Sequence, residues 1–212
     1  MSAVCASVDD LRRLAQRYLP RMVFDFVDGG AEREITLRAN CADFEPLRFA
    51  PRVLTDVSQV DLSTMLLGEQ LALPLLIAPM GLCGLVRPEG ELALARAAKA
   101  AGIPFVLSTA SSHPLEAVMD AAAGNLWFQL YLFRDRELAR SLLPRARPAA
   151  YPALVATADL TPGRHRDHAL HTVFTLPPRF PARTPVPPLP PPPLPCPLAP
   201  PPAPPLPTPP PP

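Results

Sequence analysis

The chain lacks several features that would assign it to common functional classes. Its 20 basic and 19 acidic residues leave a formal net charge of +1, and the arginines are scattered, so no basic stripe is available to bind nucleic acid. Its cysteines form no CxxC pair, which predicts reduced thiols, no bound metal and a cytoplasmic protein. Cys83 is interpreted as a small core residue. The cysteines are Cys5, Cys41, Cys83 and Cys196.

A membrane segment and a secretory signal are also missing from the sequence pattern. The first residues turn charged too early for a signal peptide. The uncharged run from Leu71 to Val86 is shorter than the ~20 residues that a spanning helix needs, and prolines and glycines interrupt it. We therefore expect no transmembrane segment, and we interpret this run as a buried strand with its following loop.

Proline, by contrast, is abundant and unevenly distributed. Residues 177–212 hold 22 of the 34 prolines, and proline has no amide hydrogen for helix or sheet ladders. We expect an amino-terminal helical and extended region at 1–70, a packed domain at 71–179 and a disordered proline-rich tail at 180–212. The tail should form polyproline II at ~3.1 Å per residue. It is either a ligand for SH3 or WW modules or an out-of-frame stretch of a GC-rich gene.

The amino-terminal region has the signals of three helices. Ser7 and Asp10 have the spacing of a capping box, which opens the first helix. Proline suits the first turn of a helix and glycine suits its end. Short extended pieces follow at 44–62. The expected helices are 9–18, one from Pro20 to the Gly29–Gly30 pair, and 31–41.

From Leu73 onward, short apolar runs alternate with helical patterns. Continuous apolar strands separated by amphipathic helices indicate an α/β fold with a parallel sheet covered by helices. A doubly wound open sheet and a (β/α)8 barrel both fit this pattern. Pro144, Pro148 and Pro152 should keep the last helix short. The expected strands are 75–78, 104–107, 126–132 and 153–158, and the expected helices are 89–101, 114–123 and 135–143.

Polar or small residues stand at the end of each expected strand. In a barrel, the carboxyl ends of the strands form the face where cofactor and substrate bind. The segment PMGLCGLV after the first strand lacks the GxGxxG turn of a Rossmann domain, so the polar residues favour the barrel. The strand-end residues are Met80 and Gly81, Ser108 and Thr109, Gln129 and Tyr131, and Thr157 and Asp159.

In these segments the chain resembles the FMN-dependent 2-hydroxy acid dehydrogenase and oxidase family, which includes glycolate oxidase, L-lactate dehydrogenase and mandelate dehydrogenase. The resemblance covers residues 7–179 and includes LPRMVFDFVDGGAE, LPLLIAPMG, RPEGELALARAAKAAGIPFVLSTASS, WFQLYLFRDRE, TADLTPGR and FTLPPR. It implies a (β/α)8 TIM barrel that binds FMN and transfers hydride from a small L-2-hydroxy acid to the flavin, leaving the 2-oxo acid.

The resemblance also implies a set of flavin contacts. The backbone of Pro79, Met80 and Gly81 would lie against the flavin ring. Hydrogen-bonding groups at the polar edge of the ring tune its electron affinity. The residues implied for that edge are Ser108, Gln129 and Thr157.

Four further residues match substrate-side or catalytic positions of the family. Tyr131 would place its hydroxyl on the substrate, and Arg166 would pair with the substrate carboxylate through its planar guanidinium. Asp159 matches the carboxylate that orients the catalytic histidine. Phe26 stands where the family usually has tyrosine, and the lost hydroxyl would cost ~1–3 kcal/mol of substrate binding.

The resemblance stops near Arg179, before the family's catalytic histidine, its neighbouring arginine, the flavin lysine and the phosphate loops. We therefore expect an incomplete barrel of about four βα units and impaired oxidation, since loss of general acid–base catalysis typically costs ~100-fold to 10,000-fold in rate. The alternatives are a noncatalytic half-barrel fragment and an interaction protein that acts through its proline tail. Open sheet edges and an exposed inner face would favour self-association.

Overall fold

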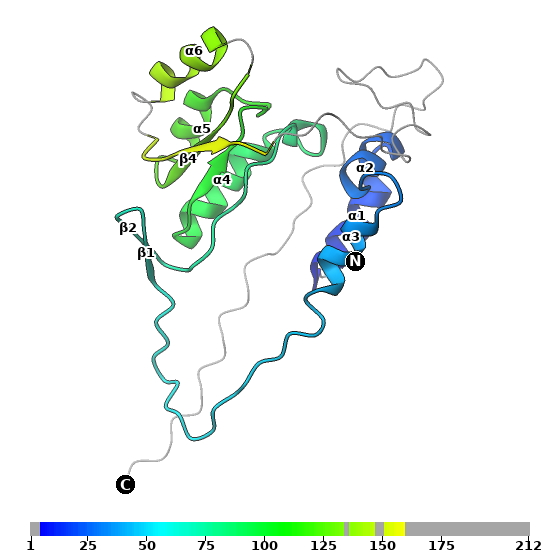
Figure 1. Ribbon diagram of the computed structural model, residues 1–212, viewed down its shortest axis with the longest axis vertical. Helices are drawn as coiled ribbons and strands as arrows, with labels where there is room; N and C mark the ends of the chain where they lie inside the picture. Colours follow the sequence, from blue (N-terminus) through cyan, green and yellow to red (C-terminus); the bar gives the residue numbers. More distant parts are fainter. Residues whose placement is uncertain (1–4, 134–135, 147–150, 160–212) are drawn as a thin grey trace. The chain divides into compact units, whose positions relative to one another are not determined.

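A computed structural model describes residues 5–133, 136–146 and 151–159 (Figure 1). The chain divides into two compact units, of which one holds the described residues 5–30 and the other begins at Ala31. The expected tail at 180–212 lies outside the described residues. The boundaries expected at residues 70 and 179 stay predictions.

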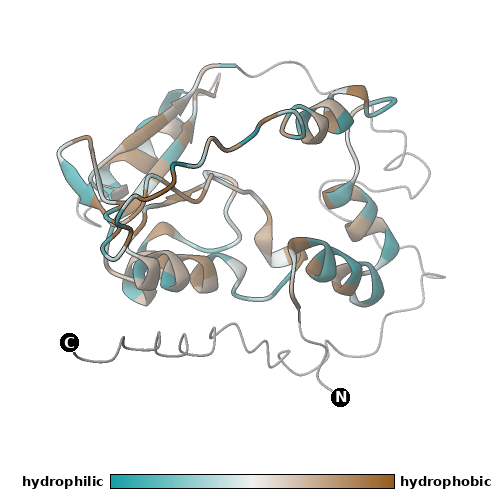
Figure 2. Ribbon diagram, turned by 90° about the horizontal axis from the view of Figure 1, so that it is seen from below, coloured by the Kyte–Doolittle hydropathy of each residue, from teal (hydrophilic) through white to brown (hydrophobic). Residues whose placement is uncertain are grey.

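The amino-terminal unit contains α1 (Val8–Tyr18) and α2 (Arg21–Asp28), as the sequence predicted. The capping box is confirmed: Ser7 Oγ accepts the Asp10 N–H at 3.3 Å, and the Asp10 carboxylate accepts the Ser7 N–H at 3.1 Å. Hydrophobic and hydrophilic residues alternate along the helices in Figure 2, the pattern of helices with one apolar face. The buried apolar side chains of α2 are Met22, Val23 and Phe24.

The second unit starts with α3 (Ile35–Ala42) and a short antiparallel hairpin of β1 (Thr64–Leu66) and β2 (Glu69–Leu71). The sequence analysis missed this hairpin. Its two turn residues, Leu67 and Gly68, have φ of 50° and 84°, which are the left-handed values that a tight two-residue hairpin requires. Leucine is a poor signal for such a turn, and three-residue strands give almost no periodicity.

The main sheet of this unit is parallel, and its strands follow the order of the chain. The segment expected as a strand at 75–78 forms only a single bridge between Ile77 and Phe105, so this part of the prediction was wrong in extent. Pro74 and Pro79 flank the segment and lack the amide hydrogens that would extend the pairing. The hydrogen-bonded strands are β3 (Phe105–Leu107), β4 (Leu126–Tyr131) and β5 (Leu154–Thr157).

Helices α4 (Gly90–Ala101), α5 (Leu115–Ala121) and α6 (Arg136–Ala146) accompany this sheet (Figure 1). Gly102 ends α4 with φ of 65°, as expected of a glycine cap. The main apolar core lies between these helices and the sheet. Its buried members are Ala95, Ala98, Phe105, Leu107, Leu115, Val118, Ala122, Leu126, Phe128, Leu130 and Ala146.

The expectation that Pro144 would shorten the last helix was wrong, because α6 continues through it to Ala146. The proline lies in the final turn, so the one hydrogen bond that it cannot donate, to the carbonyl oxygen four residues earlier, is lost close to the end of the helix. Ala146 is buried, and Arg145 pairs with Glu116 on α5. These contacts hold the last turn in place.

The other face of the sheet is also covered. Side chains alternate along a strand, so the neighbours of the core residues point away from the helices. Three of them, Val106, Trp127 and Gln129, are only 2%, 6% and 2% exposed. The expectation that this inner face stays exposed was therefore wrong for β3 and β4, whereas Val155 and Thr157 of β5 are half-buried. Burial of Val106 and Trp127 removes apolar surface from water. Self-association stays a prediction.

The pair that joins α5 to α6 gives a prediction about acid stability. Arg145 donates two hydrogen bonds to the Glu116 carboxylate, at 2.7 and 2.8 Å, and lowers the pKa of Glu116 from 4.5 to about 2. A depressed carboxyl pKa contributes stability above the unfolded value, and this contribution disappears as the pH falls through the folded value.

We therefore predict that Glu116→Gln flattens the fall in melting temperature between pH 4.5 and 2, measured by circular dichroism at low salt. Glu137→Gln is the matched control, because Glu137 pairs with Arg140 within a single helix. Identical acid profiles for Glu116→Gln and the unsubstituted chain would contradict a role for the pair.

Candidate active site

The amide of Gln129 joins the carboxyl ends of three adjacent strands. Its Oε1 accepts hydrogen bonds from the Thr109 N–H at 3.1 Å and from the Ser108 hydroxyl at 3.3 Å. Its Nε2 donates to the Thr157 Oγ1 at 2.7 Å. The structure thus brings together Ser108, Gln129 and Thr157, the three residues that the family resemblance implied for the polar edge of the flavin. Their contact with a flavin stays a prediction.

Thr109 adds two hydrogen bonds between the ends of β3 and β4. Its hydroxyl donates to the Gln129 carbonyl oxygen at 2.5 Å and accepts the Tyr131 N–H at 3.3 Å. The sequence placed Thr109 at a strand end but assigned it no role. The available signal was the pair of adjacent hydroxyl residues, Ser108 and Thr109, after an apolar strand. Thr109 keeps the ends of β3 and β4 in register.

Residues 79–81 follow Ile77 as a loop, and all three are exposed. Gly81 lies against the loop that follows β3, where an added Cβ would come within 2.9 Å of the Ala110 Cβ. The Leu82 N–H donates to the Ala110 carbonyl oxygen at 2.9 Å. Only glycine permits this close approach of the two loops. The contact of Pro79, Met80 and Gly81 with a flat ring stays a prediction.

The structure describes three of the four residues that were predicted on the substrate side. Tyr131 ends β4 opposite Thr157, and its half-buried ring meets the ring of Phe133 edge to face at 6.1 Å. Asp159 is exposed just beyond β5, so both residues lie at the same end of the sheet as Gln129. Phe26 is half-buried on α2 of the other unit. Arg166 lies outside the described residues.

A buried carboxylate lies behind these loops and was missed by the sequence analysis. Glu91 is 0% exposed, accepts the Ser112 N–H at 2.8 Å and pairs with His113 Nδ1 at 3.0 Å. Burial raises the pKa of Glu91, but the hydrogen bonds donated to it outweigh burial and leave this pKa below its ordinary value. A glutamate at the start of an alanine-rich helix was the only signal.

The neighbouring Cys83 is half-buried and lies outside the main apolar core, so its interpretation as a core residue was wrong. Burial, with a smaller contribution from the Glu91 carboxylate, raises the pKa of its thiol above 9.0. The thiolate is the reactive form, so this environment opposes nucleophilic chemistry. Across residues 5–133, 136–146 and 151–159, no three histidine, cysteine or acidic residues gather to form a metal site.

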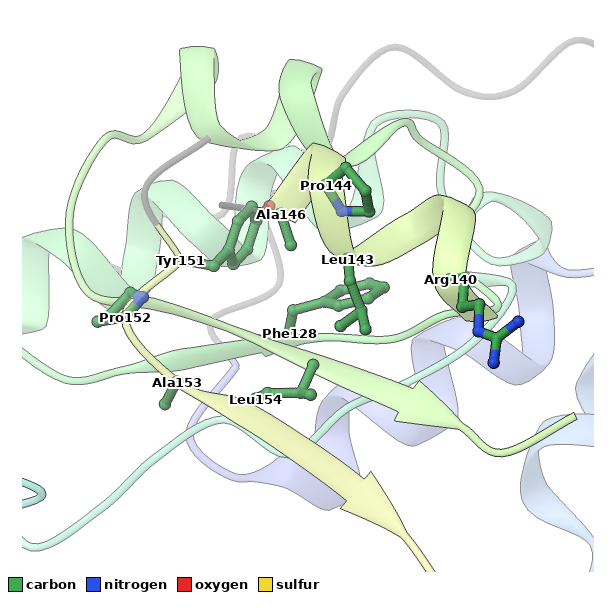
Figure 3. A pocket seen from close by; sticks show the side chains of 9 residues that line it. All are labelled: Phe128, Arg140, Leu143, Pro144, Ala146, Tyr151, Pro152, Ala153 and Leu154. Atoms are coloured by element: carbon green, nitrogen blue, oxygen red, sulfur yellow. The ribbon is translucent and has the colours of Figure 1, made fainter. Parts of the chain in front are cut away.

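An apolar hollow lies elsewhere, between α6 and the strands β4 and β5 (Figure 3). Phe128, Leu143, Tyr151 and Leu154 line it, while the Arg140 guanidinium points away from these side chains. Phe128 belongs to the helix-facing side of β4, whereas Gln129 points to the opposite side. The hollow is therefore separate from the polar strand ends.

Comparisons with known proteins match most of the chain. A family model described as FMN-dependent dehydrogenase matches residues 15–193. (S)-mandelate dehydrogenase from Pseudomonas putida is 44% identical over 183 residues, which cover 86% of this chain and 46% of the relative. L-lactate dehydrogenase from Pectobacterium atrosepticum is 46% identical over 166 residues, which cover 77% and 43%. The chain spans about half the length of these relatives.

Solved structures agree with these matches. The structure of the monotopic membrane protein (S)-mandelate dehydrogenase has a TM-score of 0.79 at 43% identity, over 85% of this chain and 48% of that chain. A mandelate oxidase variant with the C4a-OH-FMN adduct has a TM-score of 0.73 at 38% identity, over 78% and 50%. In the part of this chain that the structure describes, no helix has the length and apolar character to cross a bilayer.

Proposed function

Since the chain belongs to the FMN-dependent dehydrogenase family, whose cofactor is FMN, we propose that it binds FMN at the carboxyl ends of β3, β4 and β5. We further propose that the reaction is oxidation of a small L-2-hydroxy acid, of the mandelate, lactate or glycolate type, to the 2-oxo acid. The single observation that carries the proposal is the Gln129 amide, which gathers polar groups from three strands at one edge.

The described residues fit the polar edge of an isoalloxazine ring. That edge alternates acceptors and N–H groups, and an amide with two neighbouring hydroxyls can both donate and accept. The Gln129 amide is fixed by its own hydrogen bonds to Thr109 and Thr157, so its orientation is set before any ligand arrives. Gly81 lets the adjoining loop pack closely against the loop after β3, since an added Cβ would meet the Ala110 Cβ.

The proposed chemistry divides between cofactor and protein. Bound FMN would supply the hydride acceptor. Tyr131 would hold the substrate, and Arg166 would pair with the substrate carboxylate. Asp159 would stabilise a cationic proton acceptor. Phe26 would contribute apolar contact without the hydroxyl of a tyrosine. Among the described residues the only histidine is His113, which pairs with Glu91, and His165, His168 and His171 lie outside them. None of the four stands in the family's catalytic histidine motif, so turnover is proposed to be slower by ~100-fold to 10,000-fold than in an enzyme with a positioned base.

The decisive measurement is the visible absorbance spectrum of the freshly purified chain. We expect a yellow protein with flavin bands, which mandelate, lactate or glycolate bleaches slowly in the absence of oxygen. Colourless protein that takes up no added FMN would contradict the proposal for this chain. Colourless protein that gains flavin only when mixed with a complementary half barrel would support the noncatalytic fragment instead.

Two further expectations remain proposals. An interaction role for the proline tail requires that deletion of residues 180–212 abolish a partner interaction. A cytoplasmic location stays a prediction, because a structural relative is a monotopic membrane protein.

A further inference from the structure

The loop that begins at Pro79 is fastened to the loop after β3 at two hydrogen bonds. The Leu82 N–H donates to the Ala110 carbonyl oxygen, and the Gly84 N–H donates to the Ser112 hydroxyl oxygen, both at 2.9 Å. The fit is tight, since a Cβ at Gly84 would come within 2.8 Å of the Ser112 Oγ. The position of Ser112 therefore determines where the first loop lies.

Glu91 determines the position of Ser112. Its Oε1 accepts the Ser112 N–H at 2.8 Å, and its Oε2 pairs with His113 Nδ1 at 3.0 Å, so both carboxylate oxygens are engaged. The side chain is 0% exposed, and a buried charge is tolerated only where such partners hold it. It projects from the first turn of α4, whose Ala95 and Ala98 are buried in the core.

We propose that Glu91 is a positioning residue that acts through Ser112 and Gly84 to hold the backbone of Pro79, Met80 and Gly81 where FMN binds. The proposal rests on the proposed function and extends it to a residue on α4. The contacts from α4 to the first loop are continuous. The Glu91 carboxylate accepts the Ser112 N–H, the Ser112 hydroxyl accepts the Gly84 N–H, and Gly84 packs against Ser112. Without the carboxylate, the loop after β3 loses the contact that positions it. The loop that begins at Pro79 then loses its support as well.

Three substitutions separate the steps of this chain of contacts. Glu91→Ala removes both acceptors, whereas Glu91→Gln keeps an oxygen that can accept the Ser112 N–H. Ser112→Ala removes the hydroxyl, which accepts the Gly84 N–H and also hydrogen-bonds the Glu91 carboxylate, but it keeps the Ser112 N–H that Glu91 accepts. It alters an exposed residue, so folding is preserved. Val118→Ala is the matched control, because Val118 is also 0% exposed but lies on α5 in the apolar core.

The first experiment is amide hydrogen exchange of the full chain without flavin, followed by NMR. We expect Glu91→Ala to speed exchange at the Gly84 and Ser112 amides about tenfold, relative to core amides such as that of Val106. Ser112→Ala should speed the Gly84 amide alone, and Glu91→Gln should stay near the unsubstituted chain. Unchanged relative exchange at Gly84 and Ser112 in Glu91→Ala would overturn the proposal.

The second experiment is FMN titration by quenching of flavin fluorescence. We expect Glu91→Ala and Ser112→Ala each to raise the FMN dissociation constant about tenfold, as loss of a supporting hydrogen bond does, with Glu91→Gln restoring most of the affinity. Val118→Ala should leave it unchanged while lowering the melting temperature. Equal losses in Glu91→Ala and Val118→Ala would overturn the positioning role. If the unsubstituted chain binds no FMN, the proposed function fails, and the exchange experiment still decides whether Glu91 holds the loop.

Discussion

Replacing Gln129 with methionine is expected to abolish the flavin absorbance of the purified protein and to lower its free energy of unfolding by about 1–3 kcal/mol. Methionine has nearly the same length and no branch, so packing changes little. The substitution leaves the Thr109 N–H without its acceptor and removes the donor to Thr157. The part-buried Thr109 N–H and the buried Ser108 hydroxyl both lose their acceptor, which accounts for the loss of stability. The absorbance spectrum and urea unfolding measure the two effects.

Thr157→Ser is the control for Gln129→Met. Serine keeps a hydroxyl within reach of the Gln129 Nε2, so flavin content and urea midpoint should stay close to those of the unsubstituted chain. A Gln129→Met protein that keeps its flavin would show that the amide does not contact the cofactor. The same variant with an unchanged urea midpoint would show that the network contributes nothing to folding.

Replacing Phe128 with alanine is expected to cost about 3–5 kcal/mol of unfolding free energy, the range typical of a large aromatic side chain lost from a core. Phe128 is 2% exposed, belongs to the apolar core, and meets the Tyr151 ring edge to face at 6.0 Å. Its removal enlarges a hollow that already exists beside it, so the neighbours have little capacity to close the gap. Urea unfolding measures the change.

The position of Phe128 predicts a second result that separates it from Gln129. Because Phe128 faces the helices, the folded Phe128→Ala protein should bind FMN within about twofold of the unsubstituted chain. Leu154→Ala is the control, since this residue lines the same hollow but is 49% exposed, and its loss should cost about 0.5–1 kcal/mol. A cost for Phe128→Ala no larger than that of Leu154→Ala would contradict the assigned core.

Local signals located most of the helices and strands. Ser7 with Asp10 marked the start of α1, Gly102 marked the end of α4, and the apolar run of β4 marked a buried strand. Each signal acts within a few residues, where backbone preference and hydrogen bonding decide the outcome. Polar residues at strand ends likewise pointed to Ser108, Gln129 and Thr157.

Where long-range contacts decided the outcome, local signals failed. Pro144 did not end α6, because burial of Ala146 and the Arg145–Glu116 pair sustained the final turn. The expected strand at 75–78 shrank to the Ile77 bridge. The sequence does not show whether tertiary contacts outweigh the cost of a proline in or beside an element, because it does not show which distant residues meet.

By itself, the amino-acid sequence determined the βα order, the caps of the helices and the polar character of the strand ends, because these depend on neighbouring residues and on the period of the pattern. Only the tertiary structure decided that one amide joins three strands and that Glu91 meets Ser112 and His113 across 21 and 22 residues of chain. Those contacts require separate loops to be packed at distances of a hydrogen bond. Close packing of the whole unit, rather than any local preference, sets such distances.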